Sequence, residues 1–442
     1  MNELAGGRPG REHRGMEMER AVVVGAGVSG LLAAMALSAS CARVTVIDWD
    51  GTEGRAAGGW QPQWLLAGGA QALEELAPDF TSDLLGVGAC PADPQRDVHS
   101  YVGGRRLHAG VTGLTGFGLS RSLLESVLRT RVEKLPQVEI WSGYDVLGLI
   151  GDRRRVTGVQ LLPRLDGGAT SYLVADLVVD AAGRGSRATC WLGELGYAGP
   201  EVDEVEVNVV YVGRHYRRVP GALGGRAATW VNYSREEPRC GVVMAQEHDV
   251  FAVVLGGMLG AAPPIDDDGM LAWAESLVCS DVAEVMRTAE PLDEPLRLDA
   301  GSNRWRRYDR SMPPDGFVAV GDALCSFNPA YGQGVTMAAR EAVLLRDVCA
   351  RTTAVTQQYF ARSTALLTDP WRIAAGRDAA LRSRTADLAD RYVQALVRVA
   401  PDDRELSAAV TRVASLAAPT KELLAPRLIG RVVARSLARR GR

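Results

Sequence analysis

The protein chain has 442 residues and a formal net charge of −3 at pH 7. This length exceeds a single ordinary hydrophobic core, so two or three substructures are expected. The small net charge gives no electrostatic reason to expect a nucleic-acid partner. The seven cysteines are odd in number and widely spaced, which predicts no disulfide framework and no metal site and fits a cytoplasmic protein. No run of about 18 apolar residues occurs, so we expect no transmembrane segment.

The first predicted element follows a polar stretch, residues 1–19, that we expect to be disordered. Residues 21–24 form an apolar strand, a glycine-rich turn follows at residues 25–30 (GAGVSG), and residues 31–37 have the composition of a helix. Asp48 ends the next apolar strand. In such a βαβ unit the glycines let the backbone approach a pyrophosphate, the helix start supplies free N–H groups, and the acidic residue holds ribose hydroxyls. The pattern predicts a dinucleotide site and leaves NAD and FAD open.

A second glycine fingerprint lies far downstream. Residues 317–320 have the pattern of a buried strand, Gly321 and Asp322 follow it, and residues 328–334 (NPAYGQG) form a proline- and glycine-rich loop. Asp322 can accept hydrogen bonds from ribityl or ribose hydroxyls, or it can cap the following helix, and both roles are compatible. Together the two fingerprints favour FAD.

These motifs resemble those of the flavoprotein monooxygenases with a para-hydroxybenzoate-hydroxylase-like fold, and the resemblance extends along nearly the whole chain from Ala21 onward. Four segments look like a bacterial branch that includes the olefin epoxidases of polyether biosynthesis, which are similar to squalene epoxidase. They are residues 120–125 (SRSLLE), 176–187 (DLVVDAAGRGSR), 321–329 (GDALCSFNP) and 331–334 (YGQG). The resemblance implies a two-domain α/β flavoprotein, in which a Rossmann-like FAD-binding domain is interleaved with an antiparallel-sheet substrate domain and followed by C-terminal helices.

The expected FAD-binding domain is discontinuous. It takes residues 20–85, 118–195 and 317–350, whereas the substrate domain takes residues 86–117 and 196–316, and a helical region takes residues 351–442. Within the substrate domain, short β-branched and aromatic runs between turn residues predict an antiparallel sheet. These runs are 205–212, 228–233, 241–245 and 250–255. A helix is expected over residues 269–287.

The resemblance also implies which residues contact FAD. Arg121, at a helix start, is expected on the pyrophosphate, because a planar guanidinium suits paired phosphate oxygens, although a helix salt bridge would also explain it. Val146 is placed in the strand whose backbone meets adenine. The full set of expected cofactor contacts is Gly25, Ala26, Gly27, Val28, Ser29, Gly30, Asp48, Trp49, Arg121, Val146, Gly321, Asp322, Pro329, Gly332, Gln333, Gly334 and Val335.

The chemistry is expected at loop 329–334. Backbone N–H groups at a helix start can stabilise the negative charge of a reduced flavin without a titrating side chain. The residues given this catalytic role are Pro329, Gly332, Gln333 and Gly334. The family chemistry inserts one oxygen atom of O2 through a flavin C4a-hydroperoxide, with electrons from NAD(P)H either directly or through a separate flavin or ferredoxin reductase. Direct use of NADPH is open, because Ala182 stands where aromatic hydroxylases of the superfamily usually carry aspartate.

The substrate pocket is expected on the antiparallel sheet and beside a short aromatic segment at residues 60–64 (WQPQW). Strand alternation places every second residue of a strand on one face, and neighbouring strands are expected to complete an apolar wall. Each of these residues could instead be ordinary core. The candidate substrate contacts are Gln61, Gln63, Trp64, Val209, Tyr211, Trp230 and Phe251.

The function predicted is epoxidation of an alkene of a polyketide or terpenoid natural product by an FAD-dependent monooxygenase. An epoxidase needs no general base to deprotonate a phenol, and the sequence contains no evident His or Tyr constellation for that task. Two alternatives stay open: an FAD-dependent aromatic hydroxylase, and an oxygen-independent flavin dehydrogenase or reductase of the geranylgeranyl-reductase type. Halogenation is disfavoured, since the chain has no Trp-x-Trp segment and only two lysines, Lys134 and Lys421.

Residues 386–442 alternate apolar and arginine positions at helical spacing. Such a basic amphipathic tail could touch anionic lipid, as the C-terminal helices of squalene epoxidase do. A helical cap packed on the protein, with arginine heads in water, is the favoured interpretation. The oligomeric state is left open.

Overall fold

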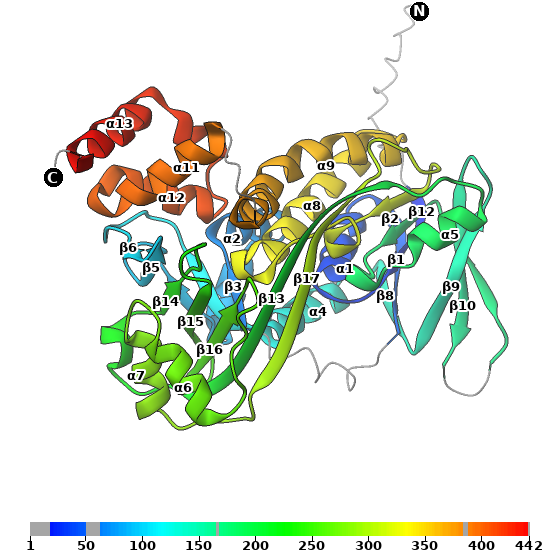
Figure 1. The fold of residues 1–442 in the computed structure, drawn as a ribbon. Helices are drawn as coiled ribbons and strands as arrows, with labels where there is room; N and C mark the ends of the chain where they lie inside the picture. The colour runs from blue at the N-terminus through cyan, green and yellow to red at the C-terminus, as the bar shows by residue number, and fades with distance from the viewer. Residues whose placement is uncertain (1–17, 50–61, 165–167, 383–387, 441–442) are drawn as a thin grey trace, which may run out of the picture.

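The computed structural model describes residues 18–49, 62–164, 168–382 and 388–440 (Figure 1). The strands are β1 (Met18–Val24), β2 (Cys41–Asp48), β3 (Pro62–Leu65), β4 (Cys90–Ala92), β5 (Val98–Val102), β6 (Arg105–Arg106), β7 (Gly116–Ser120), β8 (Val138–Ser142), β9 (Tyr144–Gly151), β10 (Val156–Pro163), β11 (Ser171–Val174), β12 (Leu177–Asp180), β13 (Glu201–Arg217), β14 (Ala228–Val231), β15 (Arg239–Gln246), β16 (Val250–Gly257), β17 (Leu296–Arg307), β18 (Phe317–Ala319) and β19 (Cys325–Ser326). The helices are α1 (Val28–Ser38), α2 (Ala67–Leu76), α3 (Phe80–Gly86), α4 (Arg121–Glu133), α5 (Ala188–Glu194), α6 (Asp267–Glu275), α7 (Asp281–Thr288), α8 (Gln333–Cys349), α9 (Val355–Trp371), α10 (Arg377–Arg382), α11 (Leu388–Val399), α12 (Arg404–Ala414) and α13 (Pro426–Arg440). The expectation of disorder for the N-terminal tail falls almost entirely on residues 1–17, which lie outside the described residues.

A five-stranded parallel sheet, in the order β18-β12-β1-β2-β8, carries the glycine motifs. Its central strand β1 is apolar and buried from Ala21 to Val24, as expected of a parallel strand covered on both faces. Helix α1 follows β1 and packs against α8 and α4. The βαβ unit expected from the first fingerprint is therefore confirmed, together with the mixed α/β fold.

An eight-stranded sheet forms the other half of the molecule, in the order β19-β17-β13-β16-β15-β14-β5-β6. Its pairings are antiparallel except for β14 beside β5. The four runs expected as strands all lie in this sheet, as β13 to β16, so the predicted antiparallel sheet is confirmed. The sheet also contains β19, which falls within the segment 317–350 that was expected in the FAD-binding domain. The division of the chain into domains stays a prediction.

One face of this sheet is covered by α6 and α7, which lie outside it in Figure 1. The prediction of a single helix over residues 269–287 is wrong, because two helices lie there, separated by a non-helical stretch from Ser276 to Ser280. The Ser276 hydroxyl donates to the Trp273 carbonyl, a local bond that competes with the helical ladder.

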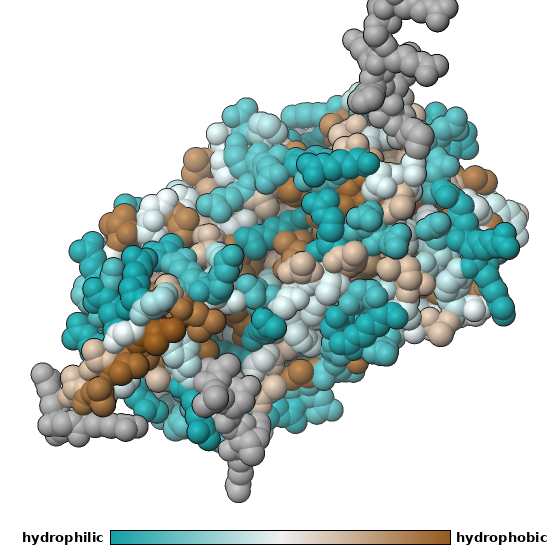
Figure 2. Space-filling model, turned by 90° about the horizontal axis from the view of Figure 1, so that it is seen from above, coloured by the Kyte–Doolittle hydropathy of each residue, from teal (hydrophilic) through white to brown (hydrophobic). Residues whose placement is uncertain are grey.

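The C-terminal helices α11, α12 and α13 form a bundle at the β5–β6 end of the sheet (Figure 1). Leu428 and Val432 of α13 are buried in it, as a helical cap requires. Ile429, Val433 and Leu437 form an exposed stripe one helical turn apart, and Figure 2 shows an apolar band beside the C-terminal end. Among the described residues, no helix is both long and apolar enough to cross a membrane. Peripheral lipid contact stays a prediction.

Helical backbone continues beyond Trp371, the last residue of α9. A π-helical turn over Arg372–Gly376 joins it to α10, so the chain continues as one helix with altered register. A π-turn takes an extra residue into one turn and rotates everything after it about the helix axis. This rotation determines which α10 side chains face the antiparallel sheet.

Candidate active site

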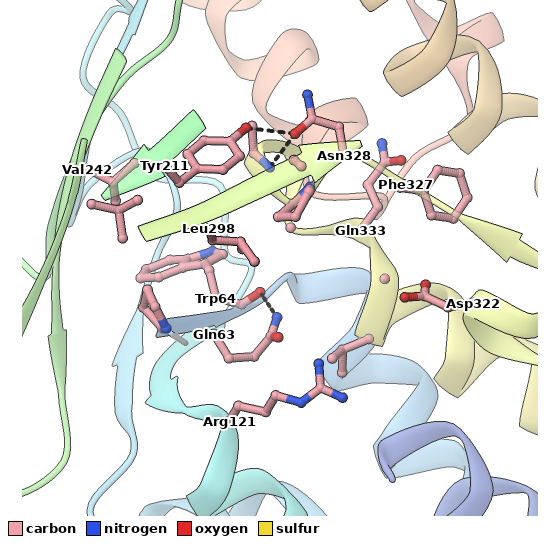
Figure 3. Close-up of a pocket in the computed structure, with 18 of the residues that line it drawn as sticks. Gln63, Trp64, Arg121, Tyr211, Val242, Leu298, Asp322, Phe327, Asn328 and Gln333 are labelled. Carbon is pink, nitrogen blue, oxygen red and sulfur yellow. Dashed lines mark hydrogen bonds between the residues drawn. The ribbon is translucent and has the colours of Figure 1, made fainter. Parts of the chain in front are cut away.

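A cavity of about 560 Å³ lies where the turn before α1, loop 329–334 and the antiparallel sheet meet (Figure 3). Arg121 and Asp322 lie toward one end of it, whereas Trp64, Tyr211 and Leu298 lie toward the other. The cavity therefore joins a charged end on the parallel-sheet side to a more apolar chamber against the antiparallel sheet.

The turn before α1 brings bare backbone to the charged end. Gly25 has φ of +105°, and a Cβ at residue 30 would lie 1.8 Å from the Gly25 carbonyl oxygen, so glycine is required at both positions. A Cβ at Gly27 would have its nearest neighbour, Glu125 Oε1, 3.9 Å away, which leaves open space in front of it. No side chain of the described residues caps α1, so its first N–H groups are available to an anion.

Loop 329–334 faces the same cavity. It consists of a 3₁₀ turn, Pro329–Tyr331, followed by Gly332 at φ +62°, from which α8 starts. A Cβ at Gly334 would meet nothing within 4 Å. The Oε1 of buried Gln333 has no hydrogen-bond partner among the described residues. Open space beside backbone donors and an unpaired amide oxygen fits a flat polar ring.

Three arginines surround Asp322 at the charged end. Arg184 Nε lies 3.6 Å from the Asp322 carboxylate, and Arg184 is anchored on the Phe327 carbonyl. Burial raises the pKa of Asp322, while Arg184, Arg121 and Arg306 act against that rise. Arg184 lines the cavity and lies within the motif at 176–187, yet it is not among the cofactor contacts expected from the sequence.

These residues fit FAD. The glycine turn, the start of α1 and the arginines match a pyrophosphate, and the Gly332–Gln333–Gly334 backbone matches the flavin ring. Ten expected cofactor residues line the cavity: Gly27, Val28, Ser29, Arg121, Asp322, Pro329, Gly332, Gln333, Gly334 and Val335. The individual contacts stay predictions.

The remaining expected cofactor residues lie outside the cavity wall. The two glycine turns are shaped by four residues that do not line the cavity, which are Gly25, Ala26, Gly30 and Gly321. Asp48 ends β2, is 3 % exposed, and accepts a hydrogen bond from Arg129 at 2.9 Å. Trp49 is exposed under the guanidinium of Arg164, and Val146 lies half-buried on β9. No sequence pattern indicated that Asp48 is paired with Arg129.

Glu341 of α8 supports the Asp322 turn from behind. Its Oε2 accepts from the Gly321 N–H at 2.5 Å, and its Oε1 has no partner among the described residues. Burial raises the pKa of Glu341 to about 8, against the lowering effect of the Gly321 N–H. Gly321 itself has φ of +59°, and a Cβ there would lie 2.1 Å from Ser29 Oγ. The turn is thus held between α1 and a carboxyl group that is mostly neutral at pH 7.

The apolar chamber is walled by Trp64 and Trp230, whose rings meet edge to face at 6.3 Å. Gln63 lines the wall as well, and its Nε2 donates to the Trp64 carbonyl. Gln63, Trp64, Tyr211 and Trp230 line the cavity, and their contact with a substrate stays a prediction. The sequence missed four further apolar residues of this wall, which are Val242, Met244, Val254 and Leu298.

Two predicted substrate contacts are wrong. Phe251 lies on the opposite face of the sheet, in the cluster under α6 and α7, because alternation along β16 turns Val254 rather than Phe251 to the cavity. Val209 is 1 % exposed and is enclosed in a cluster with Tyr233 and Met258, so it does not reach the cavity surface. Gln61 lies outside the described residues.

Six polar side chains form a hydrogen-bonded group at the inner end of the chamber, which we call the Asn328 cluster. They are Tyr211, Tyr233, Asn303, Asn328, Tyr331 and Asp378. Tyr211, Tyr233 and Asn328 line the cavity, whereas Asp378 is fully buried behind them. Tyr211 was expected on the wall, but the sequence analysis missed its polar partners. The expectation of no His or Tyr constellation concerned a general base for a phenol, and burial raises the pKa of Tyr211 and Tyr233 well above the ordinary value. Asn328 belongs to the sequence motif at residues 321–329, whereas Asp378 belongs to residues 351–442, for which only helices were expected.

We predict that Gly27→Glu abolishes FAD binding without unfolding the protein. Gly27 has φ −75° and ψ −173°, which any residue adopts, so the new carboxylate extends into the open space and repels the pyrophosphate. Gly30→Ala, by contrast, should lower the unfolding temperature, because its Cβ collides with a carbonyl oxygen. The measurements are FAD released per chain on denaturation and thermal unfolding of both variants. Retention of FAD by Gly27→Glu would contradict the assignment.

A second prediction concerns Glu341→Gln. Because the folded chain raises this pKa from 4.5 to about 8, the folded state keeps a proton that the unfolded state releases between those values. Wild-type stability therefore falls across that interval relative to the glutamine variant, by up to about 1.4 kcal/mol per pH unit. Urea unfolding at several pH values measures the gap, with exposed Glu284→Gln as control. A gap independent of pH would disprove this titration.

Known proteins resemble this chain in sequence and in fold. A family model described as FAD dependent oxidoreductase matches residues 20–103. Protein Rv3254 of Mycobacterium tuberculosis is 33 % identical over 404 residues, which cover 86 % of this chain and 84 % of that protein. Among solved structures, the flavin-dependent brominase Bmp2 superposes with a TM-score of 0.66 at 15 % identity, covering 95 % of this chain and 99 % of that chain. The p-nitrophenol 4-monooxygenase PnpA from Pseudomonas putida gives 0.64 at 18 % identity, covering 90 % and 97 %.

The two structural likenesses establish the shared fold, and the family model agrees with FAD as the cofactor. The resemblance expected from the sequence motifs is confirmed. The chain belongs to the same family as Rv3254, and its residues 20–103 match the model of the FAD dependent oxidoreductases.

Proposed function

We propose that this protein is a monooxygenase that epoxidises an alkene of an apolar polyketide or terpenoid compound. The observation that carries the proposal is the single cavity that runs from the glycine turn, past loop 329–334, to the tryptophan-lined chamber. Bound FAD, once reduced, activates O2 and supplies one oxygen atom to the substrate. Overall, an alkene, O2, NAD(P)H and a proton give an epoxide, NAD(P)⁺ and water.

The protein's own residues would position and shield the reactants. The N–H groups of Gln333 and Gly334, the first two residues of α8, would stabilise negative charge on the reduced ring, whereas the Gly332 N–H donates to the Pro329 carbonyl. Trp64 and Trp230 close the chamber with large rigid rings, so that water is kept from the reacting atoms. The apolar wall holds the alkene by burial of its surface.

The ionisable groups of the chamber favour epoxidation over hydroxylation of a phenol. No histidine is among the described residues that line the cavity. Burial raises the pKa of Tyr211 and of Tyr233 well above the ordinary value, and raises that of Cys240 to about 12. Asp299 is exposed and paired with Arg297. A phenol in the chamber therefore has no strong base beside it, whereas an alkene needs none.

Two further observations limit the chemistry. Lys134 follows α4 as its C-cap residue, and Lys421 lies in a 3₁₀ turn at Thr420–Leu424. Neither lysine lines the cavity, which disfavours halogenation despite the fold shared with Bmp2. Residue 182 is an alanine, so this position offers no acidic side chain, and its backbone N–H donates to the buried Asp180 carboxylate. We therefore keep a separate flavin or ferredoxin reductase as an electron source beside direct NAD(P)H.

The proposal predicts incorporation of one atom of labelled dioxygen into an epoxide. FAD-loaded protein, NADPH and a flavin reductase would be incubated with terpenoid alkenes such as geraniol and with the aromatic probe 2-naphthol. Mass spectrometry then locates the label. Label in a phenolic product instead would favour an aromatic hydroxylase. Products formed equally well without oxygen would rule out a monooxygenase.

Trp64→Ala should uncouple the reaction while leaving FAD in place. Removing the indole opens the chamber wall to water, so more of the consumed oxygen is released as hydrogen peroxide, by roughly severalfold per NADPH oxidised. Trp141→Ala serves as the control, because Trp141 lies on β8 against Tyr144, away from the cavity. Peroxide yield and FAD content are measured together. An unchanged peroxide yield would show that Trp64 does not shield the reaction.

A further inference from the structure

We infer that the inner end of the chamber is a receptor for a hydroxyl group, in which Tyr211 Oη accepts a hydrogen bond from an O–H of the substrate. The inference rests on the proposed function and narrows the substrate class to apolar compounds that carry a hydroxyl group beside the reacting alkene. It follows from the direction of every hydrogen bond in the Asn328 cluster.

All donors at the deep end of the cluster converge on Asp378. Its Oδ1 accepts from the Tyr331 hydroxyl at 2.6 Å and from the Tyr233 hydroxyl at 3.2 Å. Its Oδ2 accepts from Asn303 Nδ2 at 2.8 Å and from Asn328 Nδ2 at 3.1 Å. A carboxylate can only accept, so each of these four partners must turn a hydrogen toward it.

This convergence fixes the side-chain amide of Asn328. Its Nδ2 faces Asp378 and the Tyr233 oxygen, which leaves Oδ1 to face the Ala330 N–H at 3.1 Å and the Tyr211 hydroxyl at 2.7 Å. The flipped amide would place its oxygen against the carboxylate and its N–H groups against the Ala330 N–H. Both contacts would be repulsive, so only one orientation satisfies the cluster.

The orientation of Asn328 in turn fixes the hydrogen of Tyr211. This hydroxyl must donate to Asn328 Oδ1, as the dashed line in Figure 3 shows, and its oxygen is left to accept. The Ala330 N–H is close enough to lower the pKa of Tyr211, and a hydroxyl oxygen has a second lone pair. Tyr211 is one of the residues that line the cavity, so the O–H of a substrate in the chamber is the complement of that lone pair.

The surroundings make this acceptor selective. Tyr211 is 5 % exposed, and the neighbouring wall consists of Val242, Val254 and Leu298. A ligand without a donor would cover the Tyr211 oxygen with apolar surface and leave it unpaired, which costs binding free energy. A ligand with a hydroxyl group at that end recovers the bond.

The cluster holds the hydroxyl group without removing its proton. Asn328 stands between Tyr211 and Asp378, and an amide cannot pass a proton along as a chain of hydroxyls does. The buried carboxylate acts through bond direction, and the Asn328 side chain that transmits it also caps the 3₁₀ turn of loop 329–334. Substrate recognition and the cofactor loop are therefore joined at one residue.

The test compares binding of matched ligand pairs to the FAD-loaded protein. Geraniol and 2-naphthol each have a methyl ether that keeps the skeleton and lacks the donor. Calorimetry and the shift of the flavin absorption spectrum measure Kd, and we expect each alcohol to bind ~3- to 10-fold more tightly than its ether. Tyr211→Phe should abolish this preference, while any steric effect of the methyl group remains.

Tyr331→Phe is the matched control, because it also removes a hydroxyl that belongs to the cluster but does not line the cavity. It should keep the preference for the alcohol. FAD content and unfolding temperature establish that both variants are folded, and Asn328 Oδ1 still accepts from Ala330 in Tyr211→Phe.

Equal binding of alcohol and ether by the wild type, or binding of neither alcohol, would overturn the inference, as would a preference that survives in Tyr211→Phe or disappears in Tyr331→Phe. These outcomes are independent of the oxygen-labelling experiment. A monooxygenase without hydroxyl preference and a hydroxyl-selective protein without oxygen transfer are therefore distinguishable.

Discussion

The buried amide of Asn328 is the contact on which the arrangement of the site depends. It joins the start of the cofactor loop to β13 through Tyr211 and to α10 through Asp378, while its backbone N–H donates to Asn303 of β17 at 2.7 Å. Three segments that are far apart in the chain are thereby fixed relative to loop 329–334. Each polar group involved is buried, and one left unpaired would cost roughly 1–3 kcal/mol, so the arrangement is held as a unit.

Two buried carboxyl groups flank the cofactor region, and the protein accommodates them in opposite ways. Asp378 receives four hydrogen-bond donors, which satisfy both of its oxygens in the interior. Glu341 receives the single N–H of Gly321, and its pKa is raised to about 8, so the proton itself removes the charge. The number of donors that converge on each group makes this difference, and both groups position glycine-containing turns at the cavity.

The apolar chamber shows how much of a sheet can be predicted from the strand patterns of the sequence. Apolar runs and turn residues were enough to place β13 to β16 in one antiparallel sheet. They did not tell which face of β16 meets the cavity, because both faces are apolar: Phe251 and Val253 pack under α6 and α7, whereas Val254 lines the chamber. When helices cover one side of a sheet and a cofactor domain covers the other, alternation gives two equivalent faces, and packing chooses between them.

The sequence by itself determined the features that depend on local backbone geometry. Gly25 and Gly30 are needed because a turn of six residues brings a carbonyl oxygen against its own helix, and that requirement is visible in the order of residues. Only the tertiary structure decided the polar end of the chamber. Asp378 reaches Asn328 across 50 positions, by way of a π-turn that rotates α10, and no periodic pattern records such a rotation. The direction of the Tyr211 hydrogen bond likewise follows from all the partners of one buried carboxylate together. Those partners come from β17, from the chain just after β14 and from residues 328–331.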